Sequence, residues 1–114
     1  MSHEKSIEEL FLQYVQGADG TKNKNPKIAN KSHDRMHVAF KILRESEEGR
    51  QKILSLLNHE SPHVRLWAAG HSLKWRPNEA KSVLEALRDS DSPGSVSAEI
   101  TLKEFEKGSL SFDY

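Results

Sequence analysis

The sequence predicts an all-α protein with about six helices, arranged as antiparallel neighbours. Apolar residues recur at helical spacing along most of the 114 residues. Residues that cap or start helices, including several prolines, precede these stretches. The links between them are short, which favours antiparallel pairing of successive helices. Before residue 109 we find no strand-length stretch in which apolar and polar residues alternate.

Composition predicts a single folded domain over residues 1–114. Hydrophobic residues make up 35% and charged residues 30%, but the apolar residues are concentrated in periodic stretches, which argues against disorder. We expect N-terminal capping helices within residues 6–45 and helix pairs over residues 50–73 and 77–107. The absence of cysteine excludes disulfides, thiolate zinc sites and cysteine nucleophiles. With no signal peptide or membrane-length apolar run, we expect a cytoplasmic protein that does not enter a membrane.

The first predicted helix begins at a capping box. Ser6 and Glu9 have the S-x-x-E spacing in which each side chain bonds a free backbone N–H at the helix start. We expect the helix to end at Gly17 and a polar turn to follow over residues 18–25. One apolar stripe follows the cap: Ile7, Leu10, Phe11, Tyr14 and Val15.

A longer second helix is predicted from Pro26 to about Glu45. Asn25 would be its N-cap, and a proline at the first helical position loses no hydrogen bond. Residues 30–35 are polar all round, which leaves open a later start near Ser32. The apolar positions expected to face the core are Ile28, Ala29, Met36, Val38, Ala39, Phe40, Ile42 and Leu43.

Four further helices are predicted beyond Gly49, which we expect to separate the second helix from the third. Pro62 and Pro77 mark two helix starts, and Gly108 marks the end of the last helix. The predicted ranges are residues 50–58, 62–73, 77–88 and 95–107, the last beginning at Ser95 or Ser97. In the tail, Leu110, Phe112 and Tyr114 alternate with polar residues, which suggests either a docked extended segment or a frayed end.

Residues 50–73 resemble a HEAT-type repeat, in which two antiparallel helices are joined by a short loop. Val64 would fill the gap between the helices, and Ala68 and Ala69 would allow their close approach. Ser72 departs from the pattern, because the repeat usually has leucine there. Residues 77–107 resemble a second such repeat, but less closely. The resemblance therefore implies a short αα-superhelix of HEAT-like helix pairs.

The chain also resembles a small bacterial family known only as a domain of unknown function with a HEAT-like fold. Residues 29–37, 64–73 and 97–108 carry this resemblance. The family supplies no established activity. Helical-repeat domains of this size occur among immunity proteins that neutralise bacterial toxins, and this analogy of fold implies a protein-binding role.

Charge is distributed unevenly although the formal net charge is zero. Residues 21–44 hold seven Lys and Arg but one Asp, whereas residues 82–114 hold seven acidic residues against three basic ones. Such asymmetry can steer a charged partner toward the protein. Ordinary solvent-exposed helix faces produce the same uneven charge distribution, which is the alternative interpretation. The candidate partner-binding residues are Asp34, Arg35, His37, Trp67, His71, Trp75, Glu99 and Glu104. Core packing of the rings and an Asp34–Arg65 ion pair are the structural alternatives.

His33 and His37 are spaced as two ligands of a helical metal site would be. No third ligand is obvious, so we expect no metal, no cofactor and no catalytic residue. A packing role for the two imidazoles is the simpler interpretation. A metal-dependent enzyme built on this pair is one hypothesis for function, and it is weaker than the two that follow.

The leading hypothesis is a protein-binding module, specifically an immunity protein that occludes the active site of a bacterial toxin, a nuclease being one case. We expect the protein itself to be a monomer. The alternative is nucleic-acid binding through the basic segment 22–44. Zero net charge argues against this alternative, because nucleic-acid binders usually have a basic excess.

Overall fold

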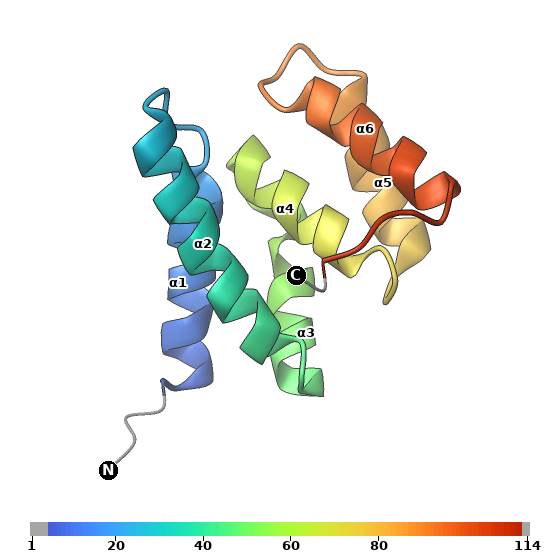
Figure 1. The fold of residues 1–114 in the computed structure, drawn as a ribbon. Helices are drawn as coiled ribbons and strands as arrows, with labels where there is room; N and C mark the ends of the chain where they lie inside the picture. The colour runs from blue at the N-terminus through green and yellow to red at the C-terminus, as the bar shows by residue number, and fades with distance from the viewer. Residues whose placement is uncertain (1–4, 113–114) are drawn as a thin grey trace. The chain divides into compact units, whose positions relative to one another are not determined.

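The computed structural model describes residues 5–112, and the regular elements within them are all helical (Figure 1). This confirms the predicted all-α class and its six α-helices. They are α1 (Ile7–Gly20), α2 (Pro26–Leu43), α3 (Glu47–Leu54), α4 (Pro62–Ser72), α5 (Pro77–Arg88) and α6 (Ser95–Glu106), with a 3₁₀ turn at Ser55–Asn58. The chain divides into two compact units, Met1–Ser55 and Leu56–Tyr114. The arrangement of such units into a superhelix stays a prediction.

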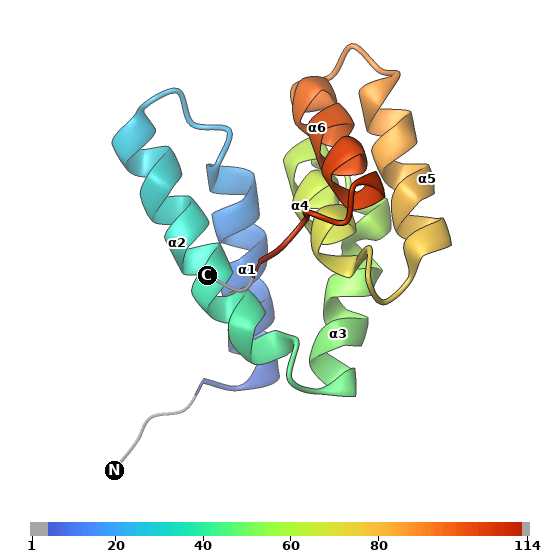
Figure 2. The ribbon, with the colours of Figure 1, turned by 45° about the vertical axis from the view of Figure 1, so that its right-hand side comes forward.

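The first unit consists of α1 and α2, which run antiparallel, and α3, which contacts both (Figures 1 and 2). The predicted N-caps Ser6 and Asn25 are confirmed, but the capping box is formed only in part, because the Glu9 carboxylate accepts from the Ser6 hydroxyl at 3.4 Å and not from the Ser6 backbone N–H. Ser6 Oγ accepts the Glu9 N–H at 3.2 Å, and Asn25 Oδ1 accepts the Lys27 N–H at 3.0 Å. Because the Asn25 cap is made, α2 begins at Pro26 and not near Ser32.

Two helix boundaries placed at glycines are wrong. The first helix continues through Gly17 to Gly20, and α3 begins at Glu47, so that Gly49 lies inside it. A Cβ atom at Gly17 would lie 2.6 Å from the Ser32 carbonyl oxygen, and one at Gly49 would overlap the Leu43 carbonyl. These glycines are explained by the close approach of a neighbouring backbone and do not mark helix ends.

The second unit packs α4, α5 and α6 against one another, with α5 and α6 antiparallel (Figure 2). The predicted bounds of these helices agree with the structure to within one residue. Val64, Ala68 and Ala69 are fully buried, as expected from their place in the repeat-like stretch. Gly108 has the positive φ of 75° that a helix-ending glycine adopts.

The tail is docked as far as residue 112. The Phe112 ring meets the His71 ring edge-on, with 4.6 Å between the centroids. Leu110 and Phe112 are both partly buried. The docked alternative is therefore confirmed for these residues, and Tyr114 lies outside the described residues.

Candidate partner-binding surface

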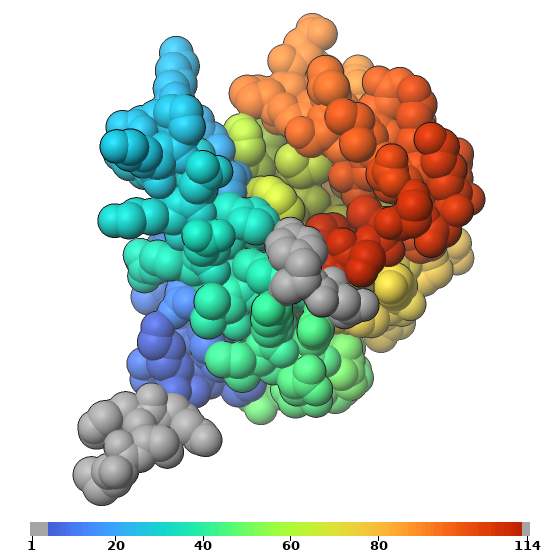
Figure 3. All heavy atoms as spheres, viewed as in Figure 1, coloured from blue at the N-terminus to red at the C-terminus, as the bar shows by residue number. Residues whose placement is uncertain are grey.

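The most prominent exposed feature of the first unit is an outward stripe on α2. Ile28, Val38 and Ile42 keep 47%, 55% and 50% of their surface exposed. Lys31 and Arg35, also exposed, lie between them at successive spacings of three and four residues, which return to one side of a helix. We call these five residues, Ile28, Lys31, Arg35, Val38 and Ile42, the α2 stripe. In the space-filling view of Figure 3, α2 (blue-green) forms part of the surface along its length.

The α2 stripe corrects the sequence analysis, which placed Ile28, Val38 and Ile42 with the core. The structure assigns the buried side of α2 to Met36, Ala39, Phe40 and Leu43, each at most 3% exposed. The helix therefore has two apolar stripes on different sides. Their spacing was visible in the sequence, but the overlapping patterns were taken for one wide stripe.

The cations of the α2 stripe are unneutralised within residues 5–112. Neither Lys31 nor Arg35 forms an ion pair with a described residue. The α2 backbone is held at this point, because buried Gln13 donates from Nε2 to the Arg35 carbonyl at 2.8 Å. Asp34 is turned toward His33, with 3.5 Å between Oδ1 and Nδ1, and its side chain is 79% exposed. The stripe thus combines aliphatic and positively charged groups on a well-anchored helix.

The acidic candidates on α6 are engaged locally. Glu99 pairs with Lys103 at 3.1 Å, and Glu104 accepts a hydrogen bond from Ser109 Oγ. Val96 and Ile100 are exposed on the same helix. Because its Glu99 carboxylate already faces a lysine, α6 offers a partner less uncompensated charge than α2 does.

The remaining candidates are aromatic, and most of their surface is used inside the protein. His37 and His71 are 7% and 4% exposed. The His37 ring stacks on His33 with 5.8 Å between centroids, and His71 contacts Trp67 at 5.7 Å as well as Phe112. Trp67 and Trp75 are half-buried. The two histidines therefore offer a partner very little surface, while the tryptophans keep one accessible side.

Arg65 is held inside the second unit. Its Nη1 donates to the carbonyls of His59 and Glu60 at 2.7 and 3.1 Å. The expected ion pair with Asp34 would join the two units and stays a prediction. Within residues 5–112 no three His, Cys, Asp or Glu residues lie close enough together to hold a metal ion. Across the same residues, no helix has the length and apolar character needed to cross a membrane.

These features define a small all-helical protein with an exposed, basic and aliphatic helix face. A family model described as Domain of unknown function (DUF2019) matches residues 9–106. The chain therefore belongs to this family, as the three sequence stretches suggested. No curated protein and no solved structure matches the chain.

Proposed function

We propose that this protein is a protein-binding module and that the α2 stripe is its contact surface. The observation that carries the proposal is that exposed aliphatic residues flank two adjacent cations on one side of α2, and that these cations have no ion-pair partner in the described residues. Interface centres are rich in apolar side chains and arginine. Spacings of three and four residues also suit packing against another helix or in a groove. The partner should present an apolar groove or helix with acidic residues at its edge.

The specific role we propose is that of an immunity protein, which binds a bacterial toxin domain and covers its active site. Support comes from the small helical fold and from the charged stripe, since complementary charge speeds association. The α2 stripe fits a toxin whose active site has an acidic rim. A nuclease toxin, whose cleft is basic, would instead have to be bound through the acidic residues around Glu99 and Glu104.

Nucleic-acid binding through residues 22–44 remains the second candidate, because Lys31 and Arg35 have no ion pair in the described residues. Phosphate contacts need cations but do not need aliphatic neighbours. Ile28, Val38 and Ile42 lie on either side of those cations along α2 and favour a protein partner. Lys22 is also partly neutralised, since it pairs with Asp19 at 3.1 Å.

The test begins with capture of the partner from the host by the tagged full-length protein, followed by identification of the partner and its purification. Calorimetric titration then compares wild type with Val38→Asp and Arg35→Glu. We expect each to weaken binding at least about tenfold, since a central interface residue contributes roughly 2 kcal/mol or more. Ile100→Asp is the matched control, because it places the same change on an exposed aliphatic residue of α6 and should leave the affinity unchanged.

The results separate the general proposal from the specific one. Unchanged affinity in both α2 variants would refute the stripe as the contact surface, and loss with Ile100→Asp would move the surface to α6. If the partner is a toxin, its activity should fall to zero at one equivalent of this protein. A partner without toxic activity would leave a binding module but would refute the immunity role.

A parallel measurement addresses nucleic acid. Fluorescence anisotropy with duplex DNA and with RNA is recorded at about 50 mM and about 200 mM salt, a range over which phosphate-mediated binding weakens strongly. We expect no binding at either concentration. Binding that falls steeply with salt and is lost in Lys31→Glu would establish the second candidate instead.

A further inference from the structure

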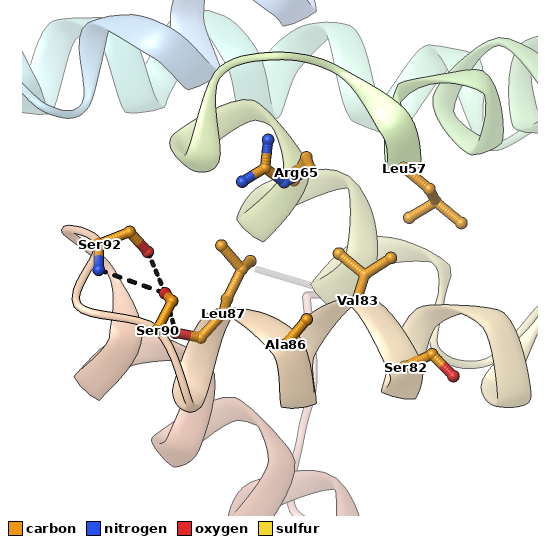
Figure 4. Close-up of a pocket in the computed structure, with 8 residues that line it drawn as sticks. All are labelled: Leu57, Arg65, Ser82, Val83, Ala86, Leu87, Ser90 and Ser92. Carbon is orange, nitrogen blue, oxygen red and sulfur yellow. Dashed lines mark hydrogen bonds between the residues drawn. The ribbon is translucent and has the colours of Figure 1, made fainter.

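The second unit contains a cavity of about 340 Å³ that lies along one side of α5 (Figure 4). Its apolar wall is formed by Leu57, Val83 and Leu87. Arg65, Ser90 and Ser92 also line it. Figure 4 shows the two serines at the end toward the α5–α6 loop, Leu57 and Val83 at the other end, and Arg65 between them, above Leu87. The cavity therefore has one apolar end and one polar end, at the small limit of ligand pockets in size.

Arg65 presents to the cavity a positive charge that no described residue of the second unit neutralises. The bonds from Nη1 to the His59 and Glu60 carbonyls fix the guanidinium in place. Within the described residues of the second unit, its Nε and Nη2 groups make no hydrogen bond and the guanidinium forms no ion pair. A fixed guanidinium with free N–H groups is suited to bind a carboxylate through two parallel hydrogen bonds.

The two serines present an acceptor and not a donor. Ser90 Oγ donates to the Leu87 carbonyl at 2.7 Å, so its proton is already used. Ser90 Oγ must then accept from Ser92 Oγ, 2.5 Å away, and it also accepts from the Ser92 N–H at 3.2 Å. The Ser92 hydroxyl proton is used in turn, which leaves the lone pairs of its oxygen for a donor on a ligand.

These three features call for a ligand with a carboxylate, an N–H donor close to it and an aliphatic group. A polypeptide chain whose last residue is aliphatic has all three groups at its C-terminus: the carboxylate, the N–H of the last peptide bond and the aliphatic side chain. We propose that the cavity binds the C-terminal residue of a peptide or protein chain that ends in an aliphatic side chain. Arg65 takes the carboxylate, the Ser92 oxygen takes the last peptide N–H, and Leu57, Val83 and Leu87 surround the side chain. The site lies in the second unit and does not depend on the α2 stripe.

The test uses the ¹⁵N-labelled full-length protein and the peptide N-acetyl-Gly-Ser-Leu with a free carboxyl end. Titration followed by NMR should shift the amide signals of α5 and of the residues around Leu57 and Arg65. Two probes each remove one feature: the same peptide with a C-terminal amide, and N-acetyl-Gly-Ser-Gly. We expect each to bind at least about tenfold more weakly, because a hydrogen bond to a charged group or a buried aliphatic side chain is lost.

Variants locate the site. Arg65→Gln should weaken binding of the free-acid peptide at least about tenfold, since the charged partner is removed. Because Arg65 also holds two carbonyls, a second variant, Ala86→Phe, fills the cavity from α5 and leaves Arg65 intact; it should abolish binding. Arg76→Gln, which changes an exposed arginine outside the cavity, is the matched control and should bind like wild type.

Equal affinity for the acid and the amide, or shifts that lie away from α5, would overturn the proposal. Unchanged binding in both Arg65→Gln and Ala86→Phe would do the same. Val38→Asp should bind the peptide normally. The failure of this site and the failure of the α2 stripe can therefore be told apart.

Discussion

The two units differ in how closely their helices pack, and their glycines show the difference. In the first unit Gly17 and Gly49 lie directly against backbone atoms of α2, so neither position has room for a Cβ. In the second unit a Cβ at Gly70 would lie 3.7 Å from Thr101 Cγ2 and 3.8 Å from Phe112 Cζ, an ordinary contact distance. Gly70 also lines a cavity of about 250 Å³, and the Arg65 cavity lies in the same unit.

The comparison shows that a glycine in the middle of a helix can accompany either close packing or unfilled space. In the first unit it permits backbone contact, which yields a tightly packed support for the α2 stripe. In the second unit it leaves space unfilled, at a cost of roughly 1 kcal/mol in helix propensity. Close packing suits a surface that presents fixed side chains, whereas unfilled space suits a unit that accepts a ligand group.

The largest effect expected is that of Gly49→Ala. The new methyl group would overlap the Leu43 carbonyl, and because this is backbone, the α2–α3 connection must move. We expect a loss of about 3 kcal/mol in the free energy of unfolding, the upper range for overpacking. Urea unfolding followed by circular dichroism measures it. Gln51→Ala, an exposed change in the same helix, is the control and should be nearly neutral; an equally small effect of Gly49→Ala would refute the close contact.

Removal of the Phe112 ring should have the next largest effect. Phe112 packs edge-on against His71, and it is the described residue that ties the tail to α4 most directly. Phe112→Ala should lower the free energy of unfolding by about 1.5 kcal/mol, the amount expected for a partly buried aromatic ring. Hydrogen exchange should rise in residues 109–112 but not in α1. A stable, fully protected tail in the variant would show that Phe112 does not dock it.

Most helix starts could be predicted from the sequence because they depend on local chemistry. Ser6, Asn25 and Ser61 cap their helices through their own side chains, and Pro62 and Pro77 have the expected first positions. The helix end predicted at Gly17 was wrong because its cause is tertiary. The start of α3 was placed too late, although Ser46 caps it locally by accepting the Gly49 N–H at 3.0 Å. A sequence does not show that another backbone passes within contact distance of a glycine.

The candidate surface was predictable only in part. Arg35 and Asp34 were identified from local charge, and both are exposed. Ile28, Val38 and Ile42 were missed as surface residues because an apolar residue is ordinarily assigned to the core. The Arg65 cavity could not have been found, because it joins side chains from the 3₁₀ turn, from α4, from α5 and from the α5–α6 loop, which only the fold brings together.

Tyr14 provides a pH test of the tight first unit. The side chain is fully buried, and burial raises the pKa of its phenol well above its ordinary value of 10.0. Below pH 10 the phenol is protonated in both states and adds no pH dependence. Above it, the unfolded chain loses the proton first and so binds fewer protons, which lowers the free energy of unfolding by about 1.4 kcal/mol per pH unit.

Urea unfolding of wild type and Tyr14→Phe at about pH 9 and about pH 11 isolates this contribution, since only wild type has a phenol at position 14, and in the unfolded chain that phenol ionises in this range. Lysines titrate in the same window but are common to both proteins. The stability difference between the two should therefore shift in favour of Tyr14→Phe as the pH rises. A difference that does not change with pH would mean that the phenol ionises as readily in the folded state.

The smallest expected effect is that of Gly70→Ala, which tests most directly whether the two units differ in how closely their helices pack. The added methyl group finds space between Thr101 and Phe112 at 3.7 and 3.8 Å, and alanine favours the helix. We expect the free energy of unfolding to rise by roughly 0.5 to 1 kcal/mol, the opposite sign to Gly49→Ala in the same urea assay. A loss of stability would mean that α4 and the tail are packed as closely as α1 and α2. In that case the contrast between the units would not hold, and the space beside Gly70 would have to be occupied.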